Sequence, residues 1–84
     1  MTKERLLEIA NELNRLVTFS DKQMSVNLEK FHNGEMMVIF WHHSPRYEGN
    51  CDCIEFYELD ASNKIDNKLE LAKKVIKGEC LIDE

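Results

Sequence analysis

The dipeptide Asn33-Gly34 constrains the fold of this chain more than any other feature, because it lies between two extended stretches. Residues 23–31 alternate apolar and polar side chains, and residues 35–42 form a mostly apolar run. Asn-Gly between such stretches is a strong signal for a β-hairpin with a two-residue type I′ turn. We therefore expect two antiparallel strands joined at this dipeptide.

A two-residue turn also predicts which side chains share a face of the hairpin. Phe31 would lie opposite Met36, and Leu28 opposite Ile39. The face toward the rest of the protein would carry Met24, Val26, Leu28, Met37, Ile39 and Trp41. The outer face would still hold four large apolar side chains, which are Phe31, Met36, Val38 and Phe40.

Two amphipathic helices and a third strand complete the expected fold. Apolar residues recur at helical spacing over residues 3–19 and 64–77, and residues 52–59 are typical of a strand. Ser62 or Asn63 would cap the second helix. We expect one α+β domain over residues 1–84, in the order α-β-β-β-α and with a short tail at 79–84. Its three-stranded antiparallel meander would have both helices on one face.

This order of elements resembles that of double-stranded RNA-binding domains. The resemblance is topological and covers no motif. Those domains carry a Lys cluster at the start of the last helix, whereas here Lys64 and Lys68 alternate with Asp66 and Glu70. The resemblance therefore implies no function for this chain.

Charge and cysteine content narrow the functional classes. The net charge is −5, which argues against direct nucleic-acid binding because that needs a basic face. Three cysteines cannot all pair within one chain, and no run is long or apolar enough for a signal peptide or a membrane span. These features predict a cytoplasmic protein with reduced thiols and no membrane partner.

The apolar outer face predicts a surface that binds another protein or a second copy of this chain. Two further features favour the same interpretation: an acidic third strand, and a loop tip with Arg46 and Tyr47. The predicted partner-binding residues are Phe31, Met36, Val38, Phe40, Arg46, Tyr47, Glu48, Asp52, Glu55, Tyr57 and Glu58.

A zinc site is the first alternative. His42 precedes the second loop, and Cys51 and Cys53 follow it. With His42 opposite Cys53, all three side chains would share the outer face, and imidazole and thiolate are ligands that zinc prefers. The spacing is not that of a zinc knuckle, so a role without any cofactor stays the main expectation.

No motif with a catalytic mechanism is present, so we expect a non-enzymatic protein. Our main hypothesis is a small acidic protein-binding module. A sharper form is an inhibitor or regulator of a nucleic-acid-handling protein, because small acidic inhibitors from phages and mobile elements have this size and charge. The second alternative is a structural homodimer whose outer sheet faces pack together.

Overall fold

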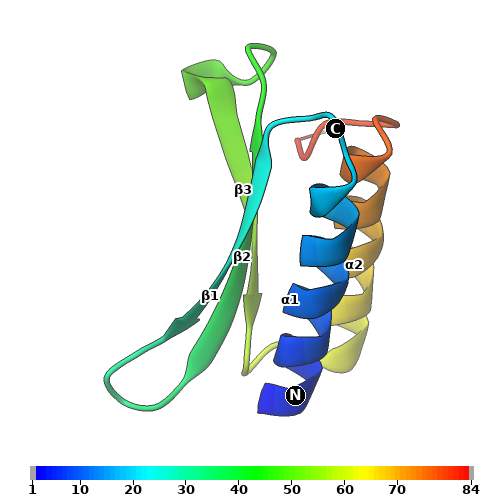
Figure 1. Ribbon diagram of the computed structural model, residues 1–84. Coiled ribbons are helices and arrows are strands. Elements are labelled where there is room, and N and C mark those ends of the chain that lie inside the picture. The colour runs from blue at the N-terminus through cyan, green and yellow to red at the C-terminus, as the bar shows by residue number, and fades with distance from the viewer. Residues whose placement is uncertain (1, 84) are drawn as a thin grey trace.

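The computed structural model of the chain describes residues 2–83. Its elements are α1 (Lys3–Thr18), β1 (Met24–Lys30), β2 (Met36–His43), the short 3₁₀ helix η1 (Glu48–Asn50), β3 (Cys51–Tyr57) and α2 (Ser62–Ile76). The strands form one antiparallel sheet in the order β1-β2-β3. Both helices lie on the same face of this sheet (Figure 1). The expected α+β class, element order and two-layer arrangement are confirmed.

The first helix forms where capping and amphipathicity coincide. Arg5 N–H donates to the Thr2 hydroxyl over 3.1 Å, so the first turn has a side-chain cap. One side of α1 then buries Leu6, Ile9 and Leu13 completely. That side packs on the sheet.

The second helix differs from its prediction at the N-terminus. It begins at Ser62, and the N-cap residue is Ala61, which has no side-chain hydrogen bond to offer. Neither Ser62 nor Asn63 is therefore the cap. Ion pairs tie α2 to one flank of α1, with Lys73 Nζ 2.9 Å from Glu12 and Asp66 Oδ1 3.7 Å from Arg5.

The first hairpin has a three-residue loop, so the predicted two-residue turn is wrong. Phe31 N–H donates to Glu35 O over 2.8 Å, which leaves His32, Asn33 and Gly34 as the loop. Gly34 adopts φ +93°, the left-handed conformation required in a three-residue hairpin loop. Lys30 consequently lies opposite Met36, whereas the predicted register places Phe31 there, so the two registers differ by one residue.

A shift of one residue turns every side chain of β2 to the other face of the sheet. Val38 and Phe40 are fully buried against the helices, and half-buried Met36 packs against the same core. The prediction that these three lie on the outer face is therefore wrong. The core cluster comprises Leu6, Ile9, Ala10, Leu13, Val38, Phe40, Ile54, Phe56, Ile65, Leu69, Ala72, Val75 and Ile76.

Candidate functional site

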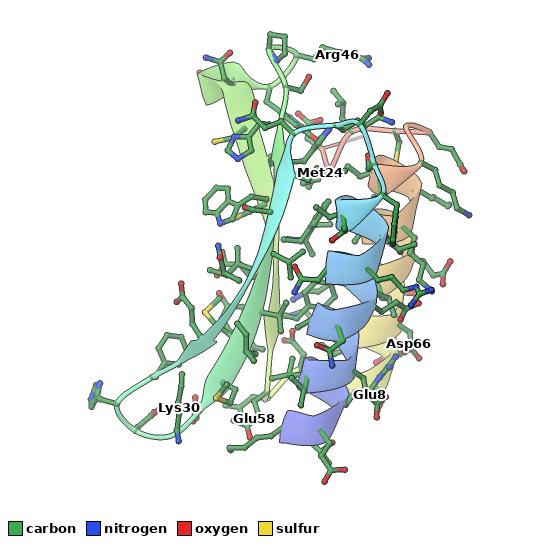
Figure 2. All side chains as sticks on the ribbon, in the orientation of Figure 1. Glu8, Met24, Lys30, Arg46, Glu58 and Asp66 are labelled. Carbon is green, nitrogen blue, oxygen red and sulfur yellow. The ribbon has the colours of Figure 1, made fainter. Side chains whose placement is uncertain are left out.

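The face of the sheet away from the helices is built from every second residue of the three strands. The register places three rows of side chains across it: Ser25 with Trp41 and Cys53, Asn27 with Ile39 and Glu55, and Glu29 with Met37 and Tyr57. Within residues 2–83, both helices pack on the opposite side, and side chains on this side point away from them (Figure 2).

The central strand supplies an apolar stripe to this face. Met37 is only 4% exposed, and Ile39 and Trp41 are half-buried. Phe31 and Tyr57 are each 38% exposed, and Phe31 continues β1 by one step on the same side, opposite Glu35. We define the open face as these five side chains and three neighbouring acids, which are Phe31, Met37, Ile39, Trp41, Tyr57, Glu29, Glu35 and Glu55.

The open face has charge of one sign. It includes Glu29, Glu35 and Glu55, and no outward position of the three strands carries Lys or Arg. Lys68 reaches its edge, with Nζ 5.4 Å from the centre of the Tyr57 ring. That ammonium group is already held by Asp60 Oδ2 at 2.8 Å. The open face thus has an apolar centre, accessible mainly at Ile39 and Trp41, with an acidic surround.

Glu55 influences both of its neighbours on the open face. The Tyr57 hydroxyl donates a hydrogen bond to Glu55 Oε2, which raises the pKa of Tyr57. Burial, followed by the charges of Glu55 and Asp52, raises the pKa of the Cys53 thiol. Both groups stay protonated at neutral pH, so Cys53 is a poor nucleophile.

The loop tip between β2 and β3 does not present a pair of side chains for binding. Arg46 is exposed and lies at the end of the molecule far from the first hairpin loop (Figure 2). Tyr47 instead folds inward, is only 4% exposed, and accepts a hydrogen bond from Ile82 N–H over 2.9 Å. Glu48 is exposed in η1, away from the centre of the open face.

The predicted acidic residues do not form one surface. Asp52 lies on the helix side opposite His42 and accepts Cys53 N–H over 2.8 Å. Glu58 binds Lys3 Nζ at 2.5 Å and Met36 N–H at 3.0 Å, which lowers the pKa of its carboxyl. Of the predicted acids, Glu55 is the one that joins the open face.

The predicted zinc ligands lie on opposite sides of the sheet. His42 pairs with Asp52 rather than with Cys53, and its side chain is buried on the helix side. Cys51 and Cys53 point to the other side, together with His43. Among the described residues 2–83, no three His, Cys, Asp or Glu side chains are grouped so that they could hold a metal ion.

A hollow of about 370 Å³ lies at the end of the sheet near the C-terminal tail. Its lining includes Lys22, His42, His43, Gly78 and Glu79. Lys22 Nζ lies 3.4 Å from Ile76 O at the end of α2. Burial first, then the charges of Lys22 and His43, lower the pKa of His42, so the ring is mainly neutral at pH 7. A neutral His42 suits a structural role in this hollow.

Comparison of the chain with known protein families, with curated proteins and with solved structures gives no match in any of the three. Within the described part of the chain, neither helix combines the length and apolarity needed to cross a bilayer.

Sequence reasoning missed Met37, Ile39 and Trp41 as outward residues. The sequence offers one partial signal, which orients β3 but does not fix its pairing with β2. In β3, alternation assigns Ile54 and Phe56 to the core, and the observed sheet pairs them with Phe40 and Val38. β2 is apolar on both sides, so its own pattern does not distinguish the two registers.

Proposed function

We propose that this chain is a non-enzymatic protein-binding module that uses its open face to hold a partner with an apolar centre and a rim of Lys and Arg. The observation that carries the proposal is the combination of Met37, Ile39 and Trp41 on the central strand with carboxylates as the charged side chains nearest to them on the outward positions of the three strands. We further propose that it acts in the cytoplasm, since Cys51, Cys53 and Cys80 are free thiols.

The apolar part of the open face supports binding to a protein. Trp41 is half-buried in the middle strand, between Ser25 and Cys53, so its ring is held in place while part of it stays accessible. Tryptophan and tyrosine are enriched among residues that dominate interface energies, especially near the centre of a patch. Trp41 and Tyr57 are thus the expected anchors.

The charge of the open face supports a basic partner over a second copy docked face to face. Such a dimer would bring Glu29, Glu35 and Glu55 of one copy against the same acids of the other. Like charges facing each other across an interface disfavour association, whereas complementary charges steer and orient it. A rim of Lys and Arg would satisfy all three carboxylates.

Proteins that handle nucleic acid carry basic surfaces of this kind. We propose such a protein as the partner, with this chain as its inhibitor or regulator. Binding on the basic surface would then compete with nucleic acid and would weaken as salt screens the charges.

The proposal is tested in two steps. This chain serves as bait in quantitative affinity capture, and the affinity of the recovered protein for the chain is then measured with both in purified form. Trp41→Glu places a charge at the centre of the open face, and Leu59→Glu is the matched control on an 81% exposed leucine of the turn after β3. The expected partner has a basic surface, binds the parent chain and Leu59→Glu equally, and loses most of its affinity for Trp41→Glu. A partner that binds all three chains equally would contradict the proposal.

A further inference from the structure

The two edges of the sheet differ in whether their backbone groups are already bonded. Glu58 N–H donates to Met36 O and Ser44 N–H to Asn50 O, so the even-numbered residues of β3 bond to β2. The odd-numbered residues of β3 therefore direct their N–H and C=O groups to the free edge.

Side chains cover much of that β3 edge. Asp52 Oδ1 accepts Cys53 N–H over 2.8 Å, and Asp60 Oδ2 accepts Tyr57 N–H over 3.0 Å. Lys68 Nζ donates to Glu55 O over 2.5 Å. Covering of this kind prevents an edge strand from pairing with another chain.

The β1 edge is open. Phe31 N–H donates to Glu35 O and His43 N–H to Gln23 O, so the odd-numbered residues of β1 bond to β2. The outward backbone groups therefore belong to the four even-numbered residues Met24, Val26, Leu28 and Lys30. Within residues 2–83, none of these outward groups has a hydrogen-bond partner.

We propose that two copies of the chain pair antiparallel through β1, about a two-fold axis at Asn27, to form one continuous six-stranded sheet. This dimer uses the edge of the sheet and not the open face, so the inference goes beyond the proposed function and stands independently of it. Both open faces would lie on the same side of the joined sheet, and the dimer would present two binding surfaces.

The sequence of β1 is complementary to itself in this register. Asn27 is the middle residue of the seven in Met24–Lys30, so a two-fold axis there pairs the strand over its full length. Ser25 would lie opposite Glu29 of the second copy, and Met24 opposite Lys30. No like charges would oppose each other, as a stable cross-strand arrangement requires.

The exposed apolar residues near this edge support a second copy as the occupant. Leu28 is 42% exposed although it points to the helix side, and Val26 of the second copy would cover it. One flank of α1 forms the ion pairs with α2, and Leu7, which is 48% exposed, lies on the other flank. This second flank would face the second copy. The dimer thus covers two leucines that the single chain leaves in water.

Cysteine cross-linking tests both the dimer and its register. Asn27 would face Asn27 of the second copy in a non-hydrogen-bonded pair, with Cα atoms about 4.5 Å apart, a separation that a disulfide spans. Glu29→Cys is the matched control, because residue 29 is exposed like residue 27 but would lie about 14 Å from its counterpart. Under mild oxidation we expect a covalent dimer linked through residue 27 for Asn27→Cys, and none through residue 29.

Peptide mapping by mass spectrometry distinguishes these links from any made by the native cysteines. A folded Asn27→Cys chain that forms no link at residue 27 would overturn the proposal. Equal linking of both variants would also overturn it, since that indicates random collision.

Sedimentation equilibrium gives a second, reagent-free test. Leu28→Pro removes an N–H group that the chain does not use internally, so the fold should survive while the dimer dissociates. Ser25→Glu would oppose Glu29 of the second copy and weaken the dimer several-fold, whereas Ser25→Lys would strengthen it. A parent chain that sediments as a monomer at all concentrations, or a dimer indifferent to all three changes, would contradict the proposal.

Discussion

The hydroxyl of Tyr47 lies 2.8 Å from Nδ1 of His42, and the two rings meet edge to face with their centres 5.4 Å apart. The same hydroxyl accepts Ile82 N–H from the C-terminal tail. Tyr47 therefore joins the end of β2, the loop that follows it and the tail. This contact explains why a tyrosine at a loop tip is buried.

Removing this hydroxyl should loosen the tail. Tyr47→Phe leaves buried His42 Nδ1 and Ile82 N–H without their partner, which should lower the free energy of unfolding by about 1–3 kcal/mol. Urea denaturation measures the loss, and faster exchange of the Ile82 amide locates it. Tyr57→Phe, which removes an exposed hydroxyl bonded to Glu55, serves as the control and should change stability much less. Equal losses in both variants would contradict this account of Tyr47.

His42 makes the stability depend on pH in a defined direction. Burial, then the charges of Lys22 and His43, lowers its pKa in the folded protein below the ordinary 6.5. The unfolded chain therefore binds more protons at His42 between the two pKa values, so stability rises with pH in that window. This contribution is fully present above pH 6.5 and is lost as the pH falls through the folded pKa.

Urea denaturation at a series of pH values tests this dependence. We expect the free energy of unfolding to decline as the pH falls below 6.5, and His42→Gln to remove that part of the decline. A decline of the same size in His42→Gln would show that another group is responsible.

The register should be visible in the stability of core variants. Phe40 is fully buried, and Phe40→Ala should cost about 3–5 kcal/mol, because it leaves a cavity under the helices. Ile39→Ala, on the adjacent residue of the same strand, should cost much less since Ile39 lies outside the core cluster. Thermal unfolding followed by circular dichroism compares the two. A larger loss for Ile39→Ala would indicate the register with a two-residue turn.

The periodicity of the sequence predicts most of this fold. The amphipathic stripes of α1 and α2 and the alternation in β1 each have one apolar side, so burial admits one orientation for each element. That is why the element order and the layer arrangement are correct. Loop length is a different kind of information, because Asn33-Gly34 is compatible with a two-residue turn and with a three-residue loop that has Gly34 at positive φ.

The location of the candidate site depends on the length of this hairpin loop. Residues 36–41 of β2 are apolar on both sides, so a shift of one residue exchanges Val38 and Phe40 for Ile39 and Trp41 and leaves apolar side chains at the centre of either face. A shift of one residue also separates the prediction that His42 lies opposite Cys53 from the observed pair of His42 and Asp52. Hydrogen bonds between distant residues, such as Tyr47 with Ile82, leave no periodic signal in the sequence at all.

Trp41 allows the central claim to be measured directly, because it is the single tryptophan of the chain and lies in the middle strand of the open face. The measurement is its fluorescence during titration with the purified basic protein recovered by Trp41-dependent capture. The account predicts a saturable shift of emission to shorter wavelength as Trp41 leaves water, with an affinity that falls as salt is raised. Saturable binding that leaves the emission of Trp41 unchanged would place the interface elsewhere and contradict the account.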